Sequence, residues 1–292
     1  LLNQALNRDD KPAALKLAMR AYCIRPNSGR AANQLFNLQV LNGQWLNAQV
    51  TNDKQVKSRL IDKKTGRRRK ALLTLQQGFE ASTSNSPESA LKYFKGSYDS
   101  DPSFIPAVLN YVKKLIEQKR DSTAIDVIKK TWRTHPHPDV VLPYWQASNA
   151  LDGPEILEKT ETLARENPNH PESFIALARA AIEAQIWSEA REHLKTLASK
   201  YDGNDEARIC RLWADLEKFE SENFSESQAW LTRALLARGD PAWICAQCGN
   251  STSDWSGFCA NCESFDSLSW TRPHTTDEGY LAAQTKPSTH NN

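Results

Sequence analysis

Four cysteines near the end of the sequence have the residue type and spacing of a metal site. They form two Cys-x-x-Cys pairs, Cys245 with Cys248 and Cys259 with Cys262, separated by ten residues. Each pair makes a tight turn whose backbone amides can donate to sulfur, and two facing turns present four thiolates to one tetrahedral ion. A closed four-sulfur shell leaves no position for water or substrate. The pattern therefore predicts a structural metal, with Zn²⁺ favoured and iron, which the same ligands bind, as the alternative.

The oxidation state of these cysteines is a second question. Two disulfides would use the same residues, but adjacent Cys-x-x-Cys pairs at this spacing are typical of metal sites, and reduced thiolates indicate a cytosolic environment. Gly249 follows the first pair and suits a turn position that needs positive φ, whereas Glu263 takes the matching place after the second. Cys23 and Cys210 stand alone in helical contexts and are predicted to be buried small apolar residues.

The metal is expected to fold a module of about 30 residues that is too small to bury a core of its own. The aromatic residues expected to cluster around the site are Trp243, Trp255, Phe258, Phe265 and Trp270. We place this zinc-ribbon module at 241–271, after a helical region at 1–240. The polar segment 272–292 carries no hydrophobic pattern and is predicted to be disordered.

Composition predicts that the elements before the module are helices. Hydrophobic residues make up 39% of the chain and glycine only 11 residues, while Ala and Leu, two strong helix formers, are the most frequent residues. Lys and Arg total 37 against 35 Asp and Glu, so no global field favours nucleic acid or an anionic membrane. No apolar run reaches the ~18–20 residues of a membrane-spanning helix. The sequence begins at Leu1 with neither Met nor a signal peptide, so we expect residues upstream.

Helix-ending residues recur at a regular spacing. Pro102, Pro136, Pro168 and Gly203 follow one another at intervals of 34, 32 and 35 residues, and a tetratricopeptide (TPR) unit has about 34. Each segment splits into two amphipathic stretches, most clearly in 171–203, while 139–168 is weak and 205–241 a few residues too long. The chain thus resembles an all-α, TPR-like helical-repeat solenoid followed by a rubredoxin-like four-cysteine zinc ribbon. Such arrays bind peptides or partner helices, which favours a scaffold.

A basic segment interrupts the array at 54–70, with nine positive charges and one negative. Such a block is most often a solvated helix face or loop. The functional alternative is an anionic surface, and because no aromatic residue interleaves the run, acidic lipid is favoured over nucleic acid. The candidate contacts are Lys63, Lys64, Arg67, Arg68, Arg69 and Lys70.

Catalytic patterns are missing from the sequence. The nucleotide-binding, hydrolase and metalloprotease signatures do not occur. We interpret none of the histidines, at positions 135, 137, 170, 193, 274 and 290, as a ligand or base. The protein is therefore predicted not to be an enzyme.

The junction Asp240-Pro241-Ala242-Trp243 and the ending Phe265-Asp266-Ser267-Leu268-Ser269-Trp270 resemble the C-terminal region of bacterial HemY-type TPR proteins, especially alphaproteobacterial ones. This resemblance implies a non-catalytic adaptor on an N-terminal inner-membrane anchor, with this region in the cytoplasm. It also implies partner proteins among the enzymes of late heme (protoheme) synthesis.

Two other families share the metal module and supply competing interpretations. LapB, a lipopolysaccharide assembly protein, also joins an anchor, TPR units and a rubredoxin-type module, and it recruits protein partners. RadA, a DNA-repair protein, has a similar module, matched here by Cys248-Gly249 and by Trp255-Ser256-Gly257 before Cys259. RadA requires a phosphate loop that this sequence lacks, so a nucleic-acid role is the weaker alternative.

Overall fold

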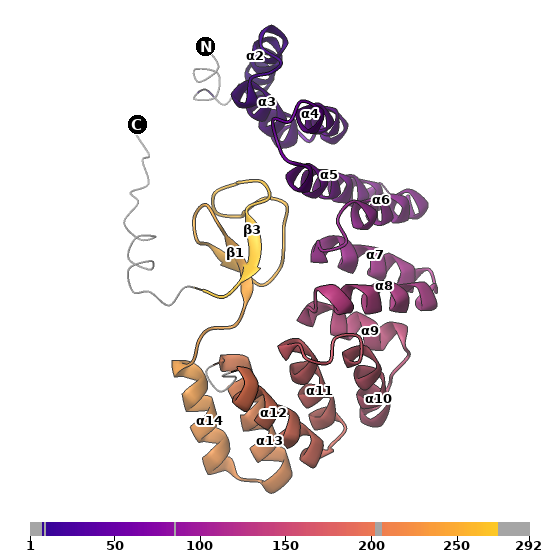
Figure 1. The fold of residues 1–292 in the computed structure, drawn as a ribbon, viewed down its shortest axis with the longest axis vertical. Coiled ribbons are helices and arrows are strands. Elements are labelled where there is room, and N and C mark those ends of the chain that lie inside the picture. Colours follow the sequence, from indigo (N-terminus) through magenta and orange to yellow (C-terminus); the bar gives the residue numbers. More distant parts are fainter. Residues whose placement is uncertain (1–7, 9, 85, 202–205, 274–292) are drawn as a thin grey trace. The chain divides into compact units, whose positions relative to one another are not determined.

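The computed structural model describes residues 8, 10–84, 86–201 and 206–273 (Figure 1). The chain divides into two compact units, Leu1–Lys114 and Leu115–Asn292. Among the described residues, no helix is both long and apolar enough to cross a membrane. The predicted disorder of 272–292 falls almost wholly outside the described residues, and the predicted boundaries of the array and the module stay predictions.

The first unit consists of helices that pack one on the next. They are α2 (Lys11–Ile24), α3 (Gly29–Leu41), α4 (Trp45–Lys57), α5 (Lys63–Thr83), α6 (Pro87–Ser100) and most of α7 (Ile105–Glu117). Each of α2 to α5 packs against the helix that follows it. Asp62 begins α5 because its carboxylate accepts the backbone N–H groups of Lys64 and Thr65. A hydrogen bond from the Thr65 hydroxyl, together with these backbone bonds, lowers the pKa of Asp62.

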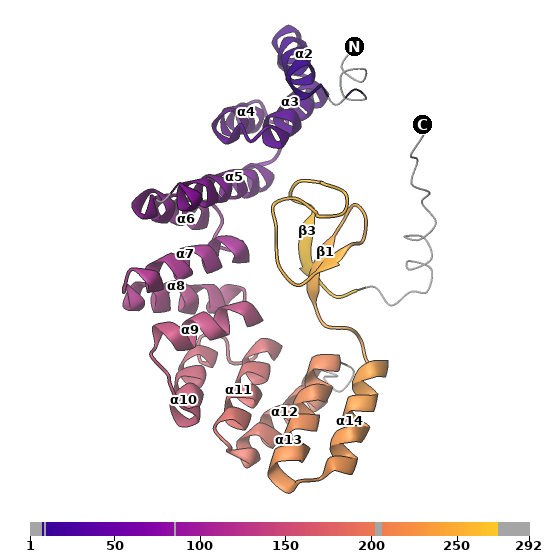
Figure 2. The same cartoon turned by 180° about the vertical axis from the view of Figure 1, so that it is seen from behind.

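The second unit continues the helical pattern and ends in a small sheet. Its helices are α8 (Asp121–Thr134), the 3₁₀ helix η1 (Pro138–Val140), α9 (Val141–Ala147), α10 (Gly153–Ala164), α11 (Pro171–Glu183), α12 (Trp187–Tyr201), α13 (Ala207–Ser221) and α14 (Phe224–Leu236). The strands are β1 (Ala242–Cys245), β2 (Ser251–Thr252) and β3 (Leu268–Thr271). β1 lies between the other two, antiparallel to both, and Figure 2 shows β1 beside β3.

One turn conformation recurs at the helix ends. The residues with positive φ, between 52° and 66°, at the ends of α3, α7, α9 and α11 are Gly43, Lys119, Asn149 and Gln185. The next residue in each turn donates its N–H to a carbonyl five residues back, as from Ile186 to Ala181 at 2.9 Å. This Schellman turn satisfies a carbonyl that the helix leaves open and starts the following helix.

The predicted all-α, TPR-like repeat fold is confirmed. The helices α6 and α8 end just before Pro102 and Pro136. In the clearest segment Ala178, Leu194 and Leu197 are fully buried between α11 and α12, as the small and large apolar positions of a hairpin require. The weak segment 139–168 contains the seven-residue α9, and this short helix explains its poor match to the TPR pattern. The segment 205–241, a few residues longer than a TPR unit, contains an ordinary hairpin of α13 and α14.

The prediction for the isolated cysteines is half wrong. Cys210 is fully buried in α13, but Cys23 is exposed. Cys23 lies half a turn around α2 from Ala14 and Ala18, the buried face of that helix, so the apolar contacts of α2 do not reach it.

Candidate metal centre and its docking surface

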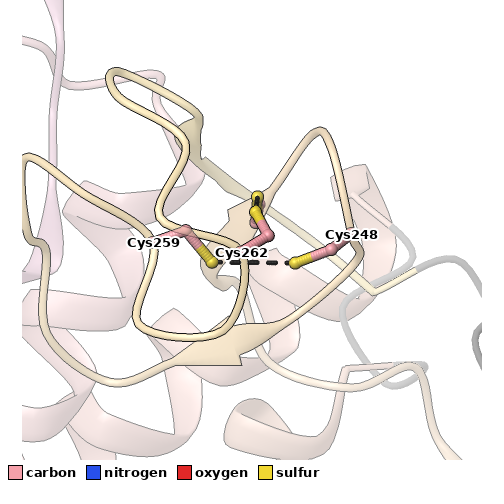
Figure 3. A group of neighbouring side chains, drawn as sticks. Cys248, Cys259 and Cys262 are labelled. Carbon is pink, nitrogen blue, oxygen red and sulfur yellow. Dashed lines mark hydrogen bonds between the residues drawn. The ribbon is translucent and has the colours of Figure 1, made fainter. Parts of the chain in front are cut away.

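The structure brings the four predicted cysteines into one cluster. All four Sγ atoms lie within 4.8 Å of one another, with Cys245 and Cys262 3.6 Å apart and Cys248 and Cys259 also 3.6 Å apart. In Figure 3 the sulfurs of Cys248 and Cys259 face each other along the dashed line, and Cys262 lies beside them. A disulfide needs about 2.05 Å, whereas four sulfurs at ~2.3 Å from a tetrahedral ion lie ~3.8 Å apart. The spacing therefore fits a cluster that could hold a metal ion.

Both turns that carry the cysteines have the same backbone geometry. The N–H of Gly249 donates to the carbonyl of Cys245, and the N–H of Glu263 donates to that of Cys259, each at 2.9 Å. Gly249 has φ 73° and Glu263 has φ 55°. Gln247 also donates its N–H to Cys245 Sγ at 3.4 Å. The second turn thus adopts the left-handed conformation without the glycine that favours it.

The electrostatics of the cluster favour a bound cation. Burial opposes ionisation of Cys245, but hydrogen bonds with the side chain of Ser267 and with the backbone of Cys248 and Gln247 outweigh it and lower its pKa to about 6. Burial raises the pKa of Cys248 to about 11, and the neighbouring sulfurs of Cys262 and Cys245 add to the increase. Four thiolates this close repel one another, so a cation is needed to ionise them all.

The aromatic residues of the module divide into two groups. Trp243 is buried with Leu268 and two of the cysteines, and Trp255 and Trp270 pack on this cluster. Phe258 and Phe265 instead contact each other, with ring centroids 5.2 Å apart. The expected cluster of five is therefore only partly formed around the sulfurs.

His137 joins the module to the helices. Its ring lies 4.6 Å from Trp270 and 6.0 Å from Trp243, centroid to centroid, and only 4% of the residue is exposed. Nδ1 accepts the backbone N–H of Asp139 at 3.2 Å and caps η1. Burial, with the charge of Arg208, lowers the pKa of His137 to about 4, so the ring is neutral at pH 7. Sequence reasoning gave His137 no role, because its partners lie more than 100 residues away.

A chain of ion pairs also fixes the module. Arg208 of α13 contacts Glu172 of α11 at 2.6 Å and Glu206 at 3.0 Å, and Glu206 in turn pairs with Arg272, just after β3. Glu206 and Glu172 are almost fully buried. Arg211 pairs with Asp240 in the segment that leads into β1. Buried charges of this kind hold a defined geometry, because removing one leaves another unpaired.

The predicted basic contacts lie on α5, and their side chains divide between two environments. The guanidinium of Arg68 lies 3.7 Å from the ring centroid of Phe104, and that of Arg69 lies 4.4 Å from that of Phe36. Arg69 also donates to Gln55 Oε1 at 3.1 Å. The exposed members are Lys63, Lys64, Arg67 and Lys70. The run therefore offers fewer cations to an external partner than its sequence suggests.

No family model matches the chain, and no curated protein matches it. Solved structures do. A structure titled as the functional characterisation of Pseudomonas aeruginosa pilF is 20% identical, covers 69% of this chain and 88% of its own, and gives a TM-score of 0.35. A tetratricopeptide repeat protein from Parabacteroides merdae is 13% identical, covers 80% and 90%, and gives 0.37. YrrB, described as a TPR protein with an unusual peptide-binding site, is 16% identical, covers 56% and 84%, and gives 0.33.

These TM-scores lie below 0.5 and are too low to support an architecture. The repeat architecture is supported instead by the contacts between the chain's own helices. Those contacts define the class: a TPR-like protein of stacked helical hairpins, with a C-terminal four-cysteine module docked on the hairpins of the second unit.

Proposed function

We propose that the protein is a non-catalytic scaffold that binds partner proteins, and that Zn²⁺ held by its four cysteines is a structural cofactor. The observation that carries the proposal is the four-sulfur cluster at the base of a module that docks through His137 and Trp270. Four sulfurs saturate a tetrahedral ion, so the ion supplies cross-linking rather than a bound water. The chain's own residues then do the recognition, on the surfaces of the hairpins.

Metal analysis of the purified protein tests the cofactor. We expect about one zinc per chain, following the ligand set. Iron in place of zinc would keep the structural role and change the ion. Neither metal in protein purified without chelator, with all six thiols titratable after denaturation, would overturn the site.

We further propose that the scaffold acts at the cytoplasmic face of the bacterial inner membrane and holds enzymes of late heme synthesis. The support is the resemblance to HemY-type proteins, and its two motifs have a structural use here: Trp243 and Trp270 face each other across β1 and β3 and both contact His137. Affinity capture of the full-length protein from membranes, followed by mass spectrometry, tests it. The proposal is supported if heme-synthesis enzymes are captured by the unmutated protein and not by the His137→Ala variant. It is contradicted if these enzymes are absent from every capture.

A LapB-like regulator of lipopolysaccharide assembly is the second candidate. It is favoured by the packing of the metal module on the helices, because LapB joins the same two parts in one chain. The same capture separates the two, because envelope-assembly proteins would replace heme-synthesis enzymes among the partners.

A further inference from the structure

A cleft between α4, α5 and α6 in the first unit has the features of a binding site. Two adjoining hollows, of about 500 and 700 Å³, form it and share Leu46, Gln77 and Tyr93 in their linings. The second hollow includes Gly96, where an added Cβ would lie 3.4 Å from Thr74 Cγ2. Gly96 itself adds no side chain to this part of the lining.

Three cations line the larger hollow. Arg67 and Lys70, one turn apart on α5, lie in the same lining as Lys92 of α6. Within the described part of the chain, none of their three charged side-chain groups has an ion pair or hydrogen bond, although the backbone carbonyl of Lys70 accepts from Thr74 Oγ1. The one carboxylate in this lining, Asp99, is paired with Lys95 at 2.5 Å. The hollow therefore carries an uncompensated positive charge, which an acidic ligand would neutralise.

Gln77 supplies a second, independent observation. It is 8% exposed, it lines both hollows, and its Nε2 has no hydrogen-bond partner in the described structure. A buried amide donor left unpaired is costly, and such groups are rare in folded proteins. A carbonyl or carboxylate oxygen of a ligand in the cleft would satisfy it.

The remaining lining mixes polar residues, among them Glu80, whose Oε1 accepts from Trp45 Nε1 at 2.5 Å, with apolar side chains. Leu46 is 67% exposed on α4, and Tyr93 lines both hollows. An amphipathic helix places apolar residues on one face and acidic residues beside them, which matches an apolar lining with cations along it. We propose that this cleft binds an acidic amphipathic segment of a partner protein. The proposal rests on the scaffold function and names the chemistry of its partner.

A membrane surface fits these features less well. A flat bilayer reaches protruding cations such as Lys63 and Lys64, but it cannot fill a hollow or accept a hydrogen bond from a buried amide. The 340 Å³ pocket beside Trp270 in the second unit is also a weaker candidate for an acidic segment. Its arginines at 179, 208 and 211 are balanced by acidic residues at 183, 215 and 240.

Selection of peptides from a random 16-residue phage-displayed library, with the whole chain as bait, tests the proposal. We expect enriched peptides to combine Asp or Glu with apolar residues at helical spacing. Their affinity should fall at least tenfold in Arg67→Glu/Lys92→Glu. The matched control Lys63→Glu/Lys64→Glu makes the same change of charge on exposed residues outside the cleft lining, and it should change affinity less than twofold.

The other outcomes each overturn the proposal. Equal losses in the two double variants would mean general surface attraction. Selected peptides without acidic residues would remove the charge argument. If vesicles of phosphatidylglycerol and phosphatidylcholine bind the chain and acidic peptides do not, the basic segment is a membrane contact. The scaffold function itself would survive these results, because the membrane capture described above tests it separately.

Gln77→Leu separates a binding role from a folding role. It removes the unpaired donor, so the unliganded protein should unfold at the same or a higher temperature. The affinity for the selected peptides should nevertheless fall three- to tenfold. A loss of stability together with unchanged affinity would show that Gln77 serves packing and would remove it from the site.

Discussion

The helical repeats and the four-cysteine module are stabilised by different means. The repeats bury large side chains, such as Trp132 and Leu194, between helices that pack mainly against those next to them along the chain. The module buries only Trp243, Leu268 and two cysteines in its own core. Size explains the difference, since a chain of about 30 residues cannot bury enough apolar surface to offset its loss of conformational entropy. We expect a metal held by the four cysteines to take the place of this core in the module, and docking on the helices to add to it.

The largest expected effect is that of removing the metal. Cys245→Ser with Cys248→Ser, or a chelator, should remove about 10 kcal/mol of metal binding energy and unfold the module, because that energy is its folding energy. Helical circular dichroism should change little, while hydrogen exchange in 241–271 rises to the unprotected rate. Loss of the helical signal at the same chelator concentration would show that the two regions fold as one.

Removing a core residue of the repeats is the reciprocal test. Trp132 is fully buried in α8 and donates from Nε1 to Ser173 Oγ at 3.0 Å. Trp132→Ala should lower the free energy of unfolding by about 3–5 kcal/mol through the cavity and the loss of this hydrogen bond. Urea unfolding measures this, and Leu235→Ala, at an 85% exposed position, is the control with a change below about 0.5 kcal/mol. Zinc content should stay at its unmutated value, and its loss would contradict the separation of the two regions.

The contact between the regions should depend on pH. The pKa of His137 falls from 6.5 to about 4 on folding, so its stabilising effect is complete above pH 6.5 and is lost as pH falls toward 4. At pH 5.5 the loss is about 1.4 kcal/mol. His137→Asn keeps an acceptor for the N–H of Asp139 and should remove this part of the pH dependence. The difference between the two proteins is the quantity to measure, because burial, with Asp254 and Glu172, raises the pKa of Asp139 and gives an opposite trend.

Local patterns predicted most of this architecture, and contacts between distant segments account for the rest. The helix ends near Pro102 and Pro136 and the two cysteine turns are set within a few residues, so spacing alone indicates them. The docking of His137 on Trp270 spans 133 positions and leaves no local trace. The charged run on α5 also contains two groups that differ only in their distant contacts. Arg68 and Arg69 lie on aromatic rings, whereas Arg67 and Lys70 line the cleft, and the sequence of the run does not distinguish them.

The smallest expected effect comes from placing glycine at a position with positive φ, once in the helices and once in the module. Glu263 follows the second cysteine turn and Gln185 ends α11, and both have positive φ, 55° and 58°. A non-glycine residue there costs about 1–2 kcal/mol, and glycine costs about 0.5–1 kcal/mol in entropy, so replacement should stabilise each site by ~0.5–1 kcal/mol.

The readouts of the two substitutions should differ. Gln185→Gly should raise the urea midpoint of the helices, whereas Glu263→Gly should leave that midpoint unchanged and raise the chelator concentration that removes the metal. Gly249→Ala, at φ 73° with open space around its Cβ position, should shift the chelator midpoint the other way through backbone strain alone. If Glu263→Gly moved the urea midpoint and not the chelator midpoint, the stability of the module would reside in its contacts with the helices rather than in its metal.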